Sequence, residues 1–346
     1  MIVAENITKS FEGFKALKNL NCVIPKGSIY GLVGSNGAGK STFLRLATGI
    51  YSPDKGSGGI SIDGEPVWEN PKGKEKFVFL PDELFFLGQT NLKRMAKFYQ
   101  SFYKDFSMER FNLLTETFKL NPKKNLSGFS KGMKRQGAMI LALCSGTEYL
   151  FFDETFDGLD PVMRNLVKNL IHEDVALRGT TVVITSHSLK ELEDTCNQLT
   201  LLHQGGIVFE SDVTNLKTSM FKIQVAYDYE YDQNLFHEID TLNFVKKGRV
   251  SNFIVRGDRE LIVAKLQEKA PLLVDILPLS LEEVFIFEME ALGYAFDFGE
   301  SASTEASMNA QPIETSMNNQ PLLGRPNLEI EKETGESISE MEATDE

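Results

Sequence analysis

Apolar residues along the first 210 positions fall into short runs that alternate with longer stretches of helical period. The runs at 149–152 and 180–185 are continuously apolar or β-branched, which is typical of strands buried on both faces of a parallel sheet. Residues 27–34 read as a further strand that leads into a glycine-rich turn, and residues 41–49 continue as a helix with apolar residues available for packing. Strands that alternate with helices in this order predict an α/β fold.

Two further regions follow a different pattern. Between residues 92 and 145 the sequence is mostly of helical period, which predicts a helical subdomain over about 82–145. Beyond residue 211 strands and helices are mixed, and we expect a small α+β domain over 212–295, with a ferredoxin-like order as one possibility. The expected strands lie at 221–227, 241–247, 250–255 and 272–277, and the expected helices at 234–239, 258–269 and 281–292.

The end of the chain, residues 296–346, differs from the rest in composition. From Glu300 on it contains no aromatic residue, and the segment at 307–312 nearly repeats at 316–321. Such a segment cannot bury enough apolar surface to fold by itself, so we expect a disordered acidic tail. Of the formal net charge of −13, residues 300–346 contribute −9. Residues 1–299 therefore carry a net charge of only −4. They lack the broad basic surface that binds nucleic acid, so nucleic acid is not expected as a partner.

The cysteines and the apolar segments indicate the compartment. Cys22, Cys144 and Cys196 are odd in number, far apart and outside any Cys-x-x-Cys pair, which argues against a disulfide framework or a zinc site. No run approaches the roughly 18 consecutive apolar residues of a membrane-spanning helix. The first residues also lack the pattern of a signal peptide. We therefore expect a cytoplasmic protein that reaches a membrane only through a partner.

The strongest chemical motif lies between the first predicted strand and the helix that follows it. The sequence Gly-Ser-Asn-Gly-Ala-Gly-Lys-Ser-Thr at 34–42 fits the P-loop pattern G-x-x-x-x-G-K-[ST]. Its glycines let successive backbone N–H groups face one concavity at a helix N-terminus, which can bind phosphate. We expect Lys40 to reach the β- and γ-phosphates of ATP, and the Ser41 hydroxyl to coordinate Mg²⁺. The expected nucleotide-binding residues are Gly34, Ser35, Asn36, Gly37, Ala38, Gly39, Lys40, Ser41 and Thr42.

A pair of carboxylates follows the apolar run at 149–152. Asp153, at the tip of that predicted strand, is expected to hold Mg²⁺ through water. Glu154, one residue further, is expected to face the γ-phosphate and to accept a proton from the attacking water. Two carboxylates after a strand are commonly only a solvated pair, but their place behind a P-loop favours the catalytic interpretation.

The residues before this strand resemble the signature motif of the nucleotide-binding subunits of ABC transporters, whose usual form is LSGGQ. The matching residues are Phe-Ser-Lys-Gly-Met at 129–133, which retain Ser130 and Gly132 but carry Lys131 and Met133 instead of glycine and glutamine. Ser130 is expected to cap the following helix, and the resemblance implies that the motif binds the γ-phosphate of ATP. Because this motif acts on the opposite subunit's nucleotide, the resemblance also implies a twofold dimer with two ATP molecules at its interface.

Two more motifs follow in the order of that family. Residues 156–161, Phe-Asp-Gly-Leu-Asp-Pro, resemble the D-loop, and Asp160 is then the residue that communicates across the dimer. His187 follows the predicted strand at 180–185 and occupies the place of the family's switch histidine, where it would contact the γ-phosphate and hold the attacking water in line. The resemblance thus implies three catalytic residues, Lys40, Glu154 and His187.

Two further matches frame the expected site. Phe11 lies in the segment whose aromatic residue stacks on adenine in this family, and an ordinary core position is the alternative. Asp82 stands where the family's Q-loop carries glutamine. Since an aspartate is shorter and charged, we expect it to contact Mg²⁺, directly or through water.

The resemblance covers about residues 1–215 and implies a P-loop NTPase with an ABC-type α/β core over 1–211. The segment at 277–285, Leu-Pro-Leu-Ser-Leu-Glu-Glu-Val-Phe, is also similar to the C-terminal segment of ATPase subunits from bacitracin- and multidrug-type exporters. Together these motifs imply a subunit that binds ATP and Mg²⁺, hydrolyses ATP and powers an ABC transporter, with export as the expected direction. Its implied partners are a separate integral membrane permease, which would hold it on the inner face of the cell membrane, and a second ATPase subunit in a homo- or heterodimer.

Two alternatives come from other classes of protein. A soluble ABC ATPase that acts on ribosomes or DNA usually carries two cassettes in one chain or a long coiled-coil insertion, and this sequence shows neither. A regulatory ATP-binding module with weak hydrolysis is the other alternative. The retained catalytic residues argue against it, whereas the departures at Lys131 and Asp82 keep it open.

Overall fold

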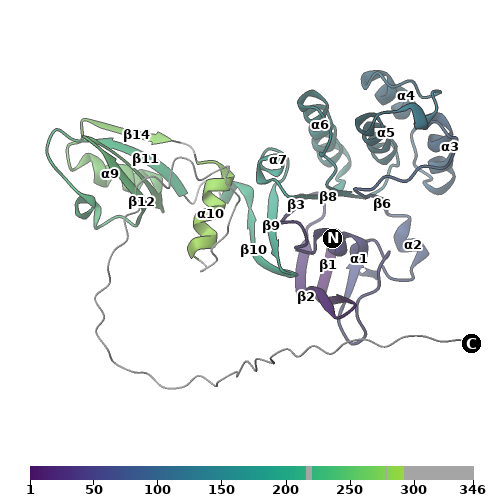
Figure 1. The fold of residues 1–346 in the computed structure, drawn as a ribbon, viewed down its shortest axis with the longest axis horizontal. Coiled ribbons are helices and arrows are strands. Elements are labelled where there is room, and N and C mark those ends of the chain that lie inside the picture. Colours follow the sequence, from purple (N-terminus) through teal and green to yellow (C-terminus); the bar gives the residue numbers. More distant parts are fainter. Residues whose placement is uncertain (216–219, 278, 292–346) are drawn as a thin grey trace, which may run out of the picture. The chain divides into compact units, whose positions relative to one another are not determined.

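The computed structural model describes residues 1–215, 220–277 and 279–291 (Figure 1). The chain divides into two units, Met1–Ala295 and Phe296–Glu346, and all described helices and strands belong to the first. The expected disordered tail lies outside the described residues. No helix among those that are described is long and apolar enough to cross a membrane.

A largely parallel sheet forms the centre of the first 212 residues. In the described part of the chain its order is β10 (Gly206–Asp212), β9 (Gln198–His203), β3 (Ile29–Val33), β8 (Thr181–Ser186), β7 (Tyr149–Asp153) and β6 (Phe77–Leu80). Only β10 is antiparallel to its neighbour. β3, β7 and β8 are buried along their whole length, which explains the continuous apolar runs in their sequences.

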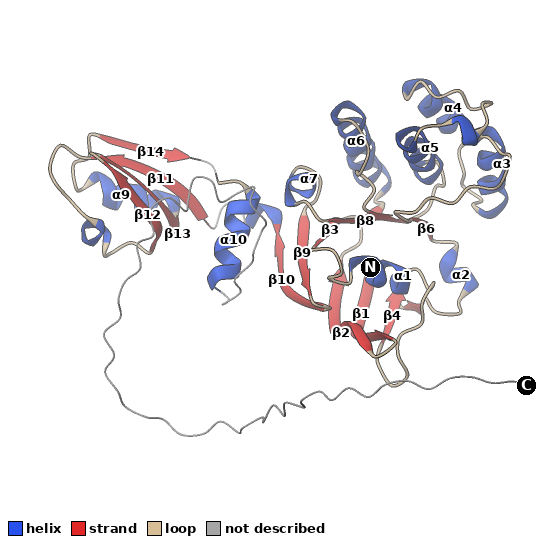
Figure 2. Cartoon of the chain, viewed as in Figure 1, coloured by secondary structure: helices blue, strands red, loops and turns tan. Residues whose placement is uncertain are grey.

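A second, antiparallel sheet comes from the N-terminal part of the chain and was not predicted. Its order is β2 (Phe14–Ile24), β1 (Ile2–Phe11), β4 (Gly59–Ile62) and β5 (Glu65–Pro66). Helix α1 (Lys40–Ala47) contacts β2 and β4 of this sheet and β7 of the parallel sheet, so one hydrophobic core fills the space between the two sheets. Helices α6 (Pro161–Arg178) and α7 (Leu189–Glu193) cover the opposite face of the parallel sheet (Figure 2).

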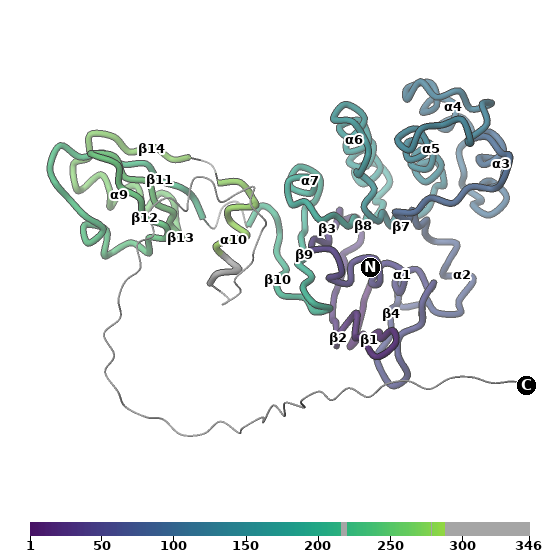
Figure 3. The backbone as a smooth tube through the Cα atoms, in the orientation of Figure 1, coloured from purple at the N-terminus to yellow at the C-terminus, as the bar shows by residue number. Residues whose placement is uncertain are grey.

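Three helices lie between β6 and β7, in the segment where we expected a helical subdomain over about 82–145. They are α3 (Leu92–Phe102), α4 (Met108–Thr117) and α5 (Lys131–Leu143), and Figure 3 follows the chain through them; the short α2 (Pro71–Lys74) precedes β6. Each of the three helices begins at a polar residue whose side chain accepts a hydrogen bond from a backbone N–H in the first turn. These caps are Asn91, Ser107 and Ser130, and α5 packs against both α3 and α4.

The residues after 219 form a separate antiparallel sheet with its own core. Its order is β12 (Thr241–Lys247), β13 (Val250–Arg256), β11 (Met220–Ala226) and β14 (Leu273–Leu277), and α9 (Arg259–Gln267) packs on β14. Helix α10 (Leu281–Ala291) follows and contacts α7. The core is rich in aromatic side chains, among them Tyr227, Phe236 and Phe253. The element order matches the ferredoxin-like possibility, except that a 3₁₀ turn at Gln233–Phe236 replaces the first helix.

Candidate functional site

The glycine-rich loop connects the end of β3 to the N-terminus of α1. Gly39 caps the helix with a φ of 111°, in the left-handed region that only glycine adopts readily. A Cβ atom on Gly39 would lie 2.7 Å from the carbonyl oxygen of Ala16, and one on Gly34 would lie 2.3 Å from the carbonyl oxygen of Leu202. Both contacts are too close for any side chain. The loop therefore needs glycine at these two positions because backbone from β2 and β9 presses against it.

Lys40 points back into this loop and also meets the acidic pair. Its Nζ donates hydrogen bonds to the carbonyl oxygens of Gly34, at 2.6 Å, and Ser35, at 3.3 Å. The same atom lies 3.2 Å from Oε1 of Glu154, and both side chains are largely buried. Phosphate oxygens would compete with the Glu154 carboxylate for this ammonium group, because both are anionic acceptors.

Ser41 and Asp153 form the part of the site that fits a divalent cation. Ser41 Oγ donates to Oδ1 of Asp153 at 3.0 Å, and Thr185 Oγ1 donates to the same oxygen at 2.7 Å. Oδ2 of Asp153 is buried and has no hydrogen-bond partner among the described residues. Burial raises the pKa of the Asp153 carboxyl, while the hydrogen bonds from Thr185 and Ser41 oppose that shift. A hydroxyl beside a carboxylate with an unsatisfied oxygen is a donor set that suits Mg²⁺.

Glu154 lies at the centre of the site. Its Oε2 is 3.0 Å from Nδ1 of His187, so its carboxylate is held between the imidazole and the Lys40 ammonium. Its backbone has a φ of 46°, and its N–H donates to Thr185 Oγ1 at 3.0 Å. The structure thus brings together three predicted site residues that follow β3, β7 and β8, because parallel strands present their carboxyl ends at one edge of the sheet.

The signature and D-loop residues lie together, apart from the P-loop. Ser130 accepts a hydrogen bond from the Met133 N–H at 3.2 Å, which confirms the predicted helix cap. A Cβ atom on Gly132 would lie 3.0 Å from the carbonyl oxygen of Gly158, so the start of α5 packs against the D-loop of its own chain. Asp160 caps α6, and its side chain is exposed, as is that of Ser130. Among the described residues, no hydrogen bond or ion pair connects Ser130, Gly132 or Asp160 to the P-loop.

The structure shows the surroundings of Phe11 and Asp82, which the sequence alone left open. Phe11 ends β1 and is 39% exposed, which excludes an ordinary core position. Its ring meets that of Tyr51 edge to face, with the ring centroids 5.3 Å apart. Asp82 directs Oδ1 to the guanidinium of Arg135 at 2.8 Å, and no described contact joins it to Ser41 or Asp153.

The sequence did not single out two residues that contact this site. Thr185 bridges Asp153 and the backbone of Glu154, and Arg135 donates to the carbonyl oxygen of Glu154 at 3.3 Å. Both act through hydrogen bonds between elements that are distant in the chain. No local pattern singles them out, because β8 contains two further hydroxyl residues, Thr181 and Ser186, and the first half of α5 contains other charged residues besides Arg135.

A phosphate loop after β3, with acidic and histidine residues at the same edge of a parallel sheet and a helical insertion before β7, defines a P-loop ATPase of the ABC class. Residues 17–157 match the family described as ABC transporter. The chain is 32% identical over 288 residues to the ABC transporter ATP-binding protein YtrB of Bacillus subtilis (strain 168), a match that covers 83% of this chain and 97% of that protein. It therefore belongs to the family of ABC transporter ATP-binding proteins.

Two other comparisons agree with this assignment. The bacitracin transport ATP-binding protein BcrA of Bacillus licheniformis is 33% identical over 225 residues, which cover 63% of this chain and 71% of that protein. A solved structure of the ATP-binding subunit of an ABC transporter has the same fold, with a TM-score of 0.58 and 23% identity, and covers 63% of this chain and 92% of that chain. The chain is thus an ATP-binding and ATP-hydrolysing transport subunit.

Proposed function

We propose that this subunit drives export through a separate membrane permease, as one half of an ATPase dimer that holds two Mg-ATP at its interface. The observation that carries the proposal is the Glu154 carboxylate, held 3.2 Å from Lys40 and 3.0 Å from His187 beside the phosphate loop. The similarity to the Nod factor export ATP-binding protein I of Burkholderia thailandensis, 28% identical over 295 residues, supports export as the direction. A cytoplasmic position on the inner face of the cell membrane follows from docking on the permease.

The residues of the site divide the chemistry between them. The loop at 34–42 and Lys40 bind the phosphates, and Ser41 with Asp153 holds Mg²⁺, which neutralises phosphate charge when it is bound. Glu154 accepts the proton of the attacking water, and His187 orients that water. Ser130, Gly132 and Asp160 contribute to the nucleotide of the other subunit, which agrees with their separation from the P-loop of their own chain. Phe11 offers an exposed aromatic face for adenine.

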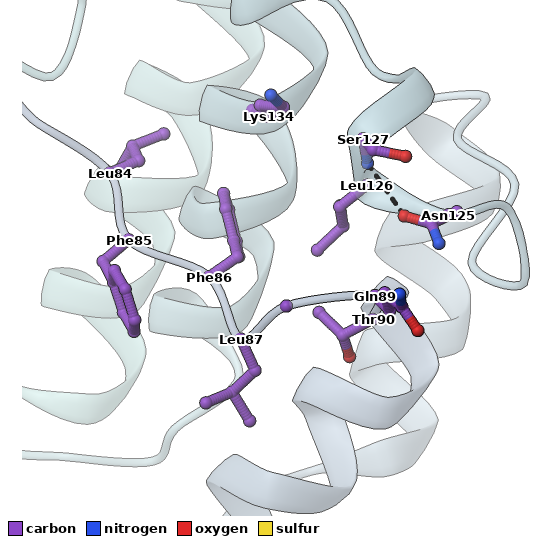
Figure 4. Close-up of a pocket in the computed structure, with 11 residues that line it drawn as sticks. Leu84, Phe85, Phe86, Leu87, Gln89, Thr90, Asn125, Leu126, Ser127 and Lys134 are labelled. Carbon is purple, nitrogen blue, oxygen red and sulfur yellow. Dashed lines mark hydrogen bonds between the residues drawn. The ribbon is translucent and has the colours of Figure 1, made fainter.

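A groove beside the helical subdomain is the docking surface we propose for the permease. It encloses about 300 Å³ between residues 84–90 and 125–127, and Lys134 completes its lining. Figure 4 shows both segments, with Leu126 opposite the part of segment 84–90 that contains Phe85, Phe86 and Leu87. Phe85 is 84% exposed, and Leu87 is also exposed. Exposed apolar side chains around a groove are typical of protein–protein contacts.

The test is purification from native membranes in mild detergent, followed by identification of the integral membrane protein that accompanies the chain. We expect one permease to co-purify with the wild type. Phe85→Asp should abolish that association and leave nucleotide binding intact, since Phe85 lies outside the phosphate site. Leu177→Asp is the matched control, because Leu177 is 76% exposed on α6 and should retain the partner. Co-purification that survives Phe85→Asp would contradict docking in the groove, and an absence of any membrane protein with the wild type would contradict the transport role.

A further inference from the structure

Arg135 is a buried cation that connects two parts of the ATPase domain. It lies on α5, is 1% exposed, and its guanidinium uses separate nitrogens for two partners. Nη2 lies 2.8 Å from Oδ1 of Asp82, which follows β6, and Nη1 donates to the carbonyl oxygen of Glu154, which follows β7, at 3.3 Å. Nε has no hydrogen-bond partner among the described residues, so these two contacts carry the polar interactions of the side chain.

The hydrogen bond from Arg135 to Glu154 is made with a residue whose backbone conformation is unfavourable by itself. Glu154 has a φ of 46°, which a residue with a side chain adopts rarely and at a cost in conformational energy. Its peptide groups are held on both sides, because its N–H donates to Thr185 and its carbonyl oxygen accepts from Arg135 at 3.3 Å and from the Asp157 N–H at 3.2 Å. This backbone conformation places the carboxylate between Lys40 and His187. Without Arg135, only the hydrogen bond from the Asp157 N–H would remain on the carbonyl side to oppose relaxation of φ, and the carboxylate would be held less firmly.

The contact with Asp82 determines where Arg135 can lie. A buried guanidinium is stable only when a carboxylate pairs with it, since desolvation of a lone charge is costly. Asp82 is the acidic partner and is about half exposed, and residues 84–90 of the groove begin two positions later.

We propose that Arg135 is a positioning residue for hydrolysis, which holds Glu154 in its left-handed conformation and does so only while Asp82 pairs with it. This inference rests on the proposed role of Glu154. It assigns Asp82 to Arg135 in place of the Mg²⁺ contact expected from the sequence.

The test compares Asp82→Glu with Asp82→Gln, two variants of equal size that differ in charge. Steady-state ATPase assays give kcat and KM for ATP, and a Mg²⁺ titration gives the concentration at half-maximal rate. Asp82→Gln should lower kcat about tenfold, as for a pair of energetically coupled residues, with little change in KM. Asp82→Glu should recover most of kcat. Glu83→Gln, which removes the neighbouring exposed carboxylate, should behave as the wild type.

A double-mutant cycle then asks whether Arg135 is the partner. Arg135→Gln should lower kcat as Asp82→Gln does, and the double variant should be no slower than either single variant. Equal kcat values for Asp82→Glu and Asp82→Gln, or additive losses in the double variant, would overturn the inference. So would a higher Mg²⁺ requirement in Asp82→Gln, which would mark Asp82 as a metal contact. If Arg135→Gln fails to fold, the comparison of Asp82→Glu with Asp82→Gln still tests the inference, because Asp82 is at the surface and its substitution should not prevent folding.

Failure of the inference and failure of the proposed role of Glu154 can be told apart. A Glu154→Gln variant that hydrolyses ATP at the wild-type rate would remove Glu154 from catalysis. If Glu154→Gln is inactive while Asp82→Gln is fully active, only the positioning role of Arg135 is overturned.

Discussion

Single residues in this site are held by contacts that serve two purposes at once. Lys40 binds the carbonyl oxygens of its own loop and also the carboxylate of Glu154. Thr185 supports Asp153 through its hydroxyl hydrogen and the Glu154 N–H through its oxygen. Because each group has a protein partner already in place, the site is preorganised, and little rearrangement is needed to orient the carboxylates.

Replacement of Glu154 by glutamine separates its role as proton acceptor from its contact with the Lys40 ammonium. Glu154→Gln should lower kcat by about 100-fold or more, because the amide cannot accept a proton from water. ATP affinity should be retained or increased, since the neutral side chain no longer competes with phosphate for the Lys40 ammonium. ATPase assays, titration with fluorescent ATP and size-exclusion chromatography with ATP should show a stable, inactive dimer.

Lys40→Ala should impair nucleotide binding, whereas Glu154→Gln should impair only hydrolysis. It removes the ammonium that faces the phosphates, so nucleotide affinity should fall and no ATP-dependent dimer should form. A Lys40→Ala variant with unchanged affinity would contradict the phosphate role of this residue.

At the scale of elements, the sequence predicted the parts of the fold that follow a regular pattern. The buried strands β7 and β8 were recognised because both faces of the sheet are covered and their residues are continuously apolar. The sheet of β1 and β2 was missed because its pairing has register shifts after Ala4, Ile7 and Lys9, which interrupt the alternation of period two. Left-handed residues in both strands, Asn6 and Asn19, add to that irregularity.

The site was predictable to the extent that its chemistry lies in contiguous motifs. The functional residues lie at or directly beside the ends of elements that the sequence predicted: Lys40 and Ser41 at the start of α1, Asp153 and Glu154 at the end of β7, and His187 after β8. The environment of Asp82 was not predictable, because its partner lies 53 positions away on α5. Which carboxylate meets which cation depends on how the helical subdomain packs against the sheet, and no local pattern encodes that packing.

The caps of α4 and α5 allow a structural role to be separated from a nucleotide role. Ser107 and Ser130 both accept a hydrogen bond from a backbone N–H three residues later, at 3.1 and 3.2 Å. Ser107→Ala and Ser130→Ala should each lower the free energy of unfolding by about 1 kcal/mol. Only Ser130→Ala should also reduce ATP-dependent dimerisation and turnover. Thermal unfolding with ATPase assays would check this, and equal ATPase activity in the two variants would leave Ser130 as a cap alone.

At the scale of the whole molecule, the net charge and the nucleotide site are separate properties. Residues 1–299 carry −4 of the total of −13, yet the candidate site binds a polyanion. It does so with a glycine-rich loop at a helix N-terminus and one largely buried lysine, which act locally and need no basic surface. No hydrogen bond or ion pair among the described residues joins the signature residues to the P-loop of the same chain, which agrees with the proposal that a second subunit completes each site.

The acidic C-terminal segment is expected to be dispensable for hydrolysis. Every residue of the candidate site lies at or before position 187, and residues 300–346 contain no aromatic group that could anchor them on a folded surface. Deletion of 300–346 should therefore leave kcat and KM for ATP within about twofold of the full chain, since residues that do not touch the site leave its transition-state interactions unchanged. Steady-state assays on the two forms at two salt concentrations would check this. A different result would contradict this expectation: the deletion lowers activity strongly, and high salt lowers the activity of the full chain to the same extent. That result would show that residues 300–346, with their net charge of −9, bind the catalytic body electrostatically.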